Sequence, residues 1–399
     1  MHAAELTARL RALSSESGNY AIDFVDLVLA AARANGASDL HLQPTSNGLR
    51  VDWRLDGVLQ PVGEFPAGRS TDIVMRLKVL AELLTYRCDL PQEGRLVAGA
   101  GELETRVSTF PTLYGERAAV RFFTVQQRLE HLHELGWSPT QLIELRDIVR
   151  RTGGAVLICG PAGSGKTTTA YAMLREIVAD SQGGRSVFSL EDPIEVPVAG
   201  VVQSQANPAA GFTLGTALRS LLRQDPEVIL VGEIRDRETA EVFLQASLTG
   251  QLVIATFHAG SAAEAITRLL DMDLEAYQLR SGLIGVIAQR LVRRLCECRQ
   301  QVSEPVELFG LPVTKAFRPV GCPDCRQTGY AGRQLIAELL RTDRPPMRQA
   351  LVPQVDTRQL VTDAIASGMV PLARRAVELV DGGITSPAEV IRVLGALSQ

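Results

Sequence analysis

The sequence predicts an α/β protein in which a small α+β domain precedes a larger domain built on a parallel sheet. From Gly154 onward, short apolar runs alternate with helix-like stretches, a pattern typical of a parallel sheet with helices on both faces. Upstream, a helix-like stretch is followed by short strand-like runs. A charged stretch, TVQQRLEHLHELGWSP, separates the two patterns, so we expect two domains joined by a linker.

Composition is that of an ordinary globular protein, because 46% of the 399 residues are hydrophobic and 22% are charged. The net charge of -4 gives no global electrostatic reason to expect a nucleic-acid partner. No apolar run approaches the roughly 18 residues of a membrane span, and the first residues contain no signal core, so we expect a cytoplasmic protein. Six cysteines are too few for a disulfide scaffold, and Cys88 and Cys159 are expected to be buried small hydrophobes.

The first domain is predicted over residues 20–125, after a tail over 1–19. AIDFVDLVLAAARANG predicts a helix that stops at Gly36, and LRVDWRL and ETRVSTF predict strands. Asp56-Gly57 is a strong hairpin signal. The linker is placed at 126–139.

The second domain is predicted over residues 140–399. Its expected strands are AVLICG, SVFSL, EVILVG and QLVIATF, and its expected helices include TTTAYAMLREIV, TLGTALRSLLRQ and ETAEVFLQASL. The stretch RSGLIGVIAQRLVRRL is expected to be a buried helix whose rim carries Arg290, Arg293 and Arg294.

GPAGSGKT fits the G-x-x-x-x-G-K-[ST] pattern at every position, follows an apolar strand and opens a helix. In such a loop the backbone N–H groups surround a phosphate chain, the lysine reaches the outer phosphates and the hydroxyl binds magnesium. The sequence therefore predicts a nucleoside triphosphate site. Its binding residues are Gly160, Pro161, Ala162, Gly163, Ser164, Gly165, Lys166, Thr167 and Thr168.

Polar residues follow three of the predicted strands, and the carboxyl ends of parallel strands meet at one edge of a sheet. Glu233 after EVILVG is a candidate to hold magnesium together with Thr167. Glu191, followed by Asp192 in SLEDPIE, is a candidate to orient the attacking water, although these two glutamate roles are exchangeable. His258 is either a structural hydrogen-bonding residue or a sensor of the γ-phosphate.

These segments resemble a known family. SLEDPIE, LRSLLRQDPEVILVGEIRDRETAEVFLQASLTG and TGQLVIATFHAG are similar to the acidic box, Walker B and histidine box of the secretion ATPases that drive type II secretion and type IV pilus assembly. ASDLHLQP, VDWRLDGVL, LPQEGRL and ETRVSTFPTLYGERAAVRFF resemble the amino-terminal domain of that family. The resemblance implies a RecA-like P-loop NTPase domain preceded by a small α+β PAS-like domain.

The resemblance also implies a mechanism and partners. The chain would hydrolyse ATP with Mg²⁺ as a homo-hexamer and move an inner-membrane platform protein, so its association with the membrane would be peripheral and through partners. Arg106 and Arg121 would reach the phosphates, and Arg219 or Arg223 would act from a neighbouring subunit. The family typically has TGH where this chain has Gln251, which cannot take up a proton near neutral pH.

Paired cysteines in LCEC and GCPDC suggest a structural Zn²⁺ site with four thiolates. Assembly-type members of the family carry such an element, but their first pair is C-x-x-C, and the shorter C-x-C here tightens the turn. The alternative is a hairpin of reduced thiols. The candidate ligands are Cys296, Cys298, Cys322 and Cys325.

Two other functions are compatible with a P-loop chain of this kind. The first is a RecA-like nucleic-acid translocase, against which the acidic net charge and the low aromatic content of 5% argue. The second is a nucleotide-gated scaffold that binds ATP and barely hydrolyses it, which Gln251 motivates.

Overall fold

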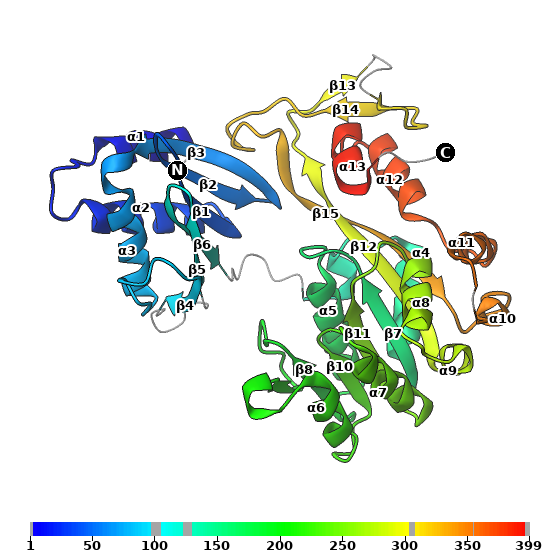
Figure 1. Ribbon diagram of the computed structural model, residues 1–399. Helices are drawn as coiled ribbons and strands as arrows, with labels where there is room; N and C mark the ends of the chain where they lie inside the picture. Colours follow the sequence, from blue (N-terminus) through cyan, green and yellow to red (C-terminus); the bar gives the residue numbers. More distant parts are fainter. Residues whose placement is uncertain (1–2, 97–104, 123–129, 303–307, 354, 396–399) are drawn as a thin grey trace. The chain divides into compact units, whose positions relative to one another are not determined.

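The computed structural model describes residues 3–96, 105–122, 130–302, 308–353 and 355–395 (Figure 1). The chain forms two compact units, Met1–Arg128 and Leu129–Gln399. The boundary between them lies inside the predicted linker.

The first unit is an antiparallel sheet with helices, as the α+β prediction requires; its PAS-like character stays a prediction. The strand order is β3-β2-β1-β6-β5-β4. Asp56 and Gly57 both have positive φ, 47° and 81°, so they form the predicted hairpin turn between β2 and β3. The elements are α1 (Ala3–Ala12), α2 (Tyr20–Ala34), β1 (Asp39–Pro44), β2 (Gly48–Leu55), β3 (Val58–Pro66), α3 (Ser70–Leu80), β4 (Gln92–Leu96), β5 (Thr105–Thr112) and β6 (Gly115–Phe122).

The predicted tail over 1–19 is wrong in part, because α1 belongs to the core of this unit. Leu6 and Leu10, one helical turn apart, are 0% and 1% exposed and pack with Phe24 and Phe65. Two apolar residues in AAELTARLRA are a weak periodic signal, and the burial comes from tertiary contacts.

The second unit contains a seven-stranded sheet in the order β15-β12-β7-β11-β10-β8-β9 (Figure 1). Its strands are parallel except for β15, which pairs antiparallel with β12. The strands are β7 (Gly154–Cys159), β8 (Val187–Glu191), β9 (Val202–Gln205), β10 (Val228–Val231), β11 (Leu252–Phe257), β12 (Leu283–Leu295) and β15 (Tyr330–Arg341), and a separate pair is formed by β13 (Gln300–Val302) and β14 (Ala316–Arg318). The helices are α4 (Pro139–Val149), α5 (Lys166–Asp180), α6 (Leu214–Leu221), α7 (Arg237–Leu248), α8 (Ala262–Asp271), α9 (Ala276–Gly282), α10 (Met347–Ala350), α11 (Thr357–Ala366), α12 (Leu372–Asp381) and α13 (Pro387–Leu394).

Both faces of the larger sheet are buried, as the apolar strand sequences predict. Along β7, Ala155 and Leu157 pack in the core shared with α6 to α9, whereas Val156 and Ile158 pack in the core shared with α4 and α5. Because β7, β10 and β11 run parallel and adjacent or nearly so, their carboxyl ends meet at one edge.

Three further predictions need correction. Residues 283–295 form strand β12 rather than a helix, because a run of apolar and β-branched residues buried on both faces has no distinguishing period. The segment placed in the linker contributes Leu132 and Trp137 to the core of the second unit. Cys159 is buried as expected, but Cys88 is exposed.

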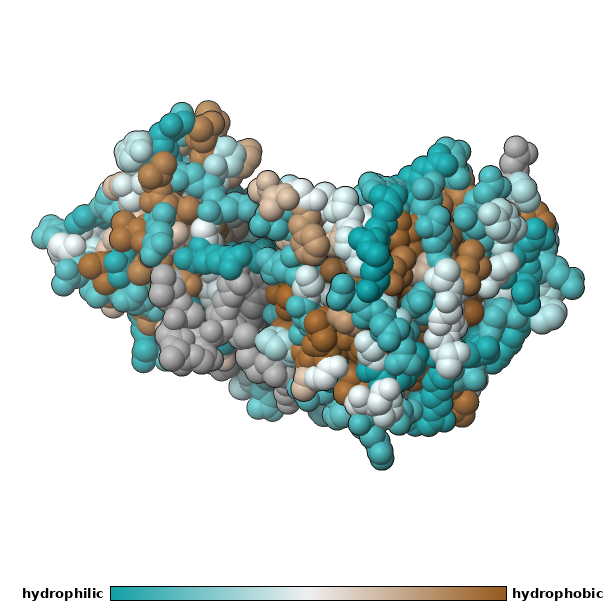
Figure 2. All heavy atoms as spheres, turned by 90° about the horizontal axis from the view of Figure 1, so that it is seen from below, coloured by the Kyte–Doolittle hydropathy of each residue, from teal (hydrophilic) through white to brown (hydrophobic). Residues whose placement is uncertain are grey.

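Among the described residues, none of the helices combines the length and apolar character that crossing a bilayer requires. On the face drawn in Figure 2, hydrophilic and hydrophobic residues are interspersed.

Candidate functional site

The predicted phosphate-binding loop connects β7, which ends at Cys159, to α5, which begins at Lys166. Gly165 caps this helix in a left-handed conformation with φ of 87°. Gly160 has φ of 151°, and a Cβ atom there would lie 2.6 Å from the carbonyl oxygen of Gln289. The strand, loop and helix predicted around GPAGSGKT are confirmed, and the loop directs the amino end of α5 toward the sheet edge.

Lys166 is held against its own loop. Its Nζ donates hydrogen bonds to the carbonyl oxygens of Gly160 and Pro161, at 2.8 and 3.0 Å. Burial lowers the pKa of Lys166, and the charge of Glu233 opposes that shift. Lys166 and Glu233 are therefore electrostatic neighbours, as a shared phosphate site requires.

Glu233 and His258 contact each other across the ends of β10 and β11. His258 Nε2 lies 2.6 Å from Glu233 Oε1, and Arg235 Nε lies 2.5 Å from Glu233 Oε2. The hydroxyl of Thr256 donates to the carbonyl of Gly232 at 2.5 Å, which ties the two strand ends together. The structure therefore brings together the two residues that the sequence placed at this edge independently.

Glu191 and Glu195, both in the segment SLEDPIE, have different surroundings. Glu191 is 3% exposed and accepts hydrogen bonds from Tyr171, from Ser189 and from Gln203. Thr167, in contrast, donates its hydroxyl hydrogen to Glu195 Oε1 at 3.1 Å. The carboxylate in contact with the P-loop is thus Glu195, which the sequence analysis did not single out although it lies within SLEDPIE.

Gln251 lies at the opposite edge of the sheet from His258. It directly precedes β11, whereas His258 directly follows it. The two residues are seven steps apart along extended chain, which corresponds to roughly 23 Å. Gln251 Oε1 accepts the hydroxyl hydrogen of Thr249 at 2.7 Å. The effect of glutamine in place of the family's histidine at position 251 stays a prediction.

The candidate arginines of the first unit lie in a row across its sheet. Arg106 is directly opposite both Arg95 and Arg121 in neighbouring strands. Arg121, whose side chain is 68% exposed, pairs with Asp39 at 3.0 Å. The phosphate-directed role of Arg106 and Arg121 stays a prediction.

Two other arginines, proposed to act on a neighbouring subunit, lie on or beside α6. Arg219 forms an ion pair with Glu238, and the Arg223 guanidinium donates to the carbonyl of Arg219 at 3.3 Å. Neither contacts the P-loop residues through any interaction described within the chain, and their action between subunits stays a prediction.

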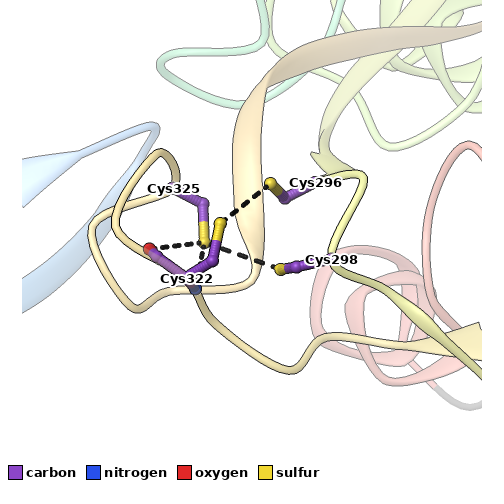
Figure 3. Close-up of side chains that lie close together, drawn as sticks. All are labelled: Cys296, Cys298, Cys322 and Cys325. Carbon is purple, nitrogen blue, oxygen red and sulfur yellow. Dashed lines mark hydrogen bonds between the residues drawn. The ribbon is translucent and has the colours of Figure 1, made fainter.

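The four cysteines at the far ends of β12 and β15 point toward one another (Figure 3). The Sγ atoms of Cys296 and Cys322 are 3.8 Å apart, as are those of Cys298 and Cys325, and all four lie within 4.8 Å of one another. Burial raises the pKa of Cys325, but hydrogen bonds from the N–H groups of Cys322 and Gly329 and with the thiols of Cys322 and Cys298 together lower the pKa to about 7. Thiolates in this arrangement are the donors that Zn²⁺ prefers. The four sulfur atoms therefore lie together although the first cysteine pair has the shorter C-x-C spacing.

A P-loop, an acidic strand end and a neighbouring histidine at one edge of a parallel sheet define a RecA-like P-loop ATPase. Residues 14–392 match the model of the family described as "Type II/IV secretion system protein". The chain belongs to this family of secretion and pilus ATPases.

Relatives of known name span most of the chain. A putative type II secretion system protein E of Escherichia coli K12 is 38% identical over 98% of this chain and 80% of its own length. The type II secretion system protein HxcR of Pseudomonas aeruginosa is 40% identical over 96% of this chain and 79% of its own. The type IV pilus assembly ATPase PilB of Thermus thermophilus is 38% identical over 92% of this chain, which spans only 42% of that protein.

Solved structures share the fold. The ATPase DotB of Legionella pneumophila, 20% identical, has a TM-score of 0.68 over 94% of this chain and 96% of that one. The pilus retraction motor PilT with bound ADP, 22% identical, has a TM-score of 0.55 over 87% of this chain and 94% of that one.

Proposed function

We propose that this chain is the ATP-hydrolysing motor of a type II secretion or type IV pilus assembly machine. It works as a homo-hexamer at the cytoplasmic face of the inner membrane and acts on a membrane platform protein. The observation that carries this proposal is the contact between Glu233 and His258 beside the P-loop, in a chain of this family. The carboxylate of Glu233 and the imidazole of His258 contact each other at the carboxyl edge of the sheet, beside the P-loop. This contact links the state of the nucleotide to the loop that follows β11.

Each side chain at this edge has a distinct task in hydrolysis. The loop N–H groups and Lys166 neutralise the charge of the phosphates. Thr167 and Glu233 would supply oxygen ligands for Mg²⁺, which when bound would neutralise charge on the phosphates. Glu195, in contact with Thr167, is better placed than the buried Glu191 to orient the attacking water, while Glu191 fixes Tyr171 and Gln203.

The tetracysteine cluster holds a structural Zn²⁺ ion in this proposal. A tetrahedral site with Zn–S distances near 2.3 Å has S···S distances of about 3.8 Å. Two sulfur pairs in the cluster lie at that distance. The donor set and these two distances support zinc, and the four sulfur atoms all lie within 4.8 Å of one another.

The test is ATP hydrolysis by the purified chain, measured over a range of protein concentrations together with native mass. We expect turnover to rise steeply where hexamers form. Liposomes that contain the platform protein should stimulate turnover further, and empty liposomes serve as the control. Stimulation by DNA with strong salt dependence would instead favour a nucleic-acid translocase.

A further inference from the structure

Strand β12 places two consecutive side chains against two different loops of the ATPase site. Gln289 is fully buried, with an exposed fraction of 0%. Its Nε2 donates to the carbonyl of Ser164 in the P-loop at 2.8 Å, and its Oε1 accepts the hydroxyl hydrogen of Thr169 in α5 at 3.0 Å. Both ends of this buried amide are therefore satisfied by the P-loop and the helix that follows it. Removing the amide would leave two buried polar groups without a partner.

Arg290 reaches the loop after β11 instead. Its guanidinium donates to the carbonyl of Gly260 at 2.8 Å and to the carbonyl of Gln289 at 2.9 Å. Glu264 accepts the N–H of Gly260 at 2.7 Å from the other side. The backbone of residue 260 is thus fixed through both its N–H and its carbonyl group. The guanidinium of Arg268 donates to the carbonyl of His258, two residues earlier, so Arg268 and Arg290 together hold this loop.

We propose that Gln289 and Arg290 are positioning residues of the ATPase site and that their tasks are separate. Gln289 holds the P-loop in its phosphate-binding shape and so sets nucleotide affinity. Arg290 holds the loop of His258 in register with Glu233 and so sets turnover. The inference rests on the proposed roles of Lys166, Glu233 and His258. The physical reason is preorganisation, because a loop already in its bound shape loses less entropy on binding and reaction.

The separation comes from the contacts themselves. Gln289 contacts Ser164 and Thr169 but has no described hydrogen bond to the His258 loop. The Arg290 side chain donates to Gly260 and to the main-chain carbonyl of Gln289 and has no described hydrogen bond to the P-loop, which it reaches only through its charge, since that charge lowers the pKa of Lys166. A purely structural strand residue would instead lower affinity, turnover and stability together.

The first experiment measures binding of fluorescently labelled ADP to the full chain. Gln289→Met keeps the volume and removes the amide, so we expect about tenfold weaker ADP binding, with turnover at saturating ATP within roughly threefold of wild type. Thr169→Val, which removes only the partner on α5, should weaken binding by roughly threefold and serves if Gln289→Met fails to fold. ADP binding of wild-type strength in Gln289→Met, or in Thr169→Val if that is the variant that folds, would overturn this half of the proposal.

The second experiment compares kcat with ADP affinity in Arg290→Gln. We expect kcat to fall by about tenfold and ADP affinity to stay within twofold, with Arg290→Lys recovering part of kcat because lysine still donates to Gly260. In a His258→Ala background, Arg290→Gln should cause no further loss, because both changes act through the same side chain. Arg294→Gln is the matched control, since Arg294 on the same strand is exposed and contacts only the side chain of Gln334 among the bonds described for it.

Equal losses of affinity and kcat in Arg290→Gln, or additive losses with His258→Ala, would contradict the role of Arg290. A failure of the proposed function looks different. If wild-type protein bound ADP and did not hydrolyse ATP, both the proposed motor function and the proposed role of Arg290 in turnover would be contradicted. The proposed role of Gln289 in nucleotide affinity would still be decided by ADP binding.

Discussion

The carboxyl edge of the seven-stranded sheet and the tetracysteine cluster both gather side chains from distant segments, but they do so by different means. At the sheet edge, Lys166, Glu233 and His258 follow strands whose spacing is set by main-chain pairing. In the cluster, two cysteines follow β12 and two precede β15, and the cross-strand pair Leu295 and Tyr330 keeps those strand ends together. We propose that the first arrangement serves chemistry and that the second serves stability. The two regions should therefore respond to mutation in opposite ways.

Replacement of Lys166 should have the largest effect on turnover. Lys166→Ala removes the ammonium group that the loop carbonyls of Gly160 and Pro161 hold at the phosphate edge. We expect ATP hydrolysis to fall by at least about 100-fold while Tm stays nearly unchanged, measured by phosphate release and calorimetry. Lys315→Ala, an exposed lysine beside Phe317, is the control. Unchanged turnover together with unchanged ATP affinity would refute the P-loop assignment.

A neighbouring change at the same edge separates binding from chemistry. Glu233→Gln keeps the size of the side chain and a contact with His258, but it removes the negative charge proposed to hold magnesium. We expect kcat to fall by about 100-fold with ADP affinity nearly retained. The assay is single-turnover hydrolysis beside ADP titration. Equal rates in Glu233→Gln and wild type would instead support a nucleotide-gated scaffold.

The sequence predicted those features that depend on local pattern. GPAGSGKT and the apolar strands placed the P-loop, Glu233 and His258 at one edge, and the structure confirms that arrangement. Contacts between segments far apart in the chain were out of reach, such as Gln289 with Ser164, which are 125 residues apart. Strand β12 was misread as a helix for the same reason, because its burial on both faces comes from neighbours that sequence periodicity does not identify.

Loss of a cluster cysteine should lower stability and leave nucleotide affinity unchanged, which is the opposite of the effect expected at the sheet edge. Cys296→Ser removes one of four converging sulfur atoms, so we expect loss of bound zinc and a fall in Tm of roughly 5 °C or more, with ADP affinity unchanged. Metal analysis and calorimetry measure both, and a chelator should reproduce the shift in wild type. Cys88→Ser, at an exposed thiol, is the matched control. A wild-type chain free of zinc after purification in zinc-containing medium would show that the cluster is a set of reduced thiols.

The smallest effect is expected at the amino end of β11, where Gln251 lies. His258→Ala at the carboxyl end should lower kcat by about tenfold, because the imidazole contacts Glu233. Gln251→His should leave kcat within twofold. The side chain at position 251 contacts Thr249 and lies at the amino end of β11, seven residue steps from His258 at the carboxyl end of the strand. Both variants are compared in the same hydrolysis assay. Gln251→His could instead raise kcat only in the assembled hexamer. That result would mean that the amino end of β11 acts on a neighbouring subunit. The contrast between the two ends of β11 would then hold only within one chain.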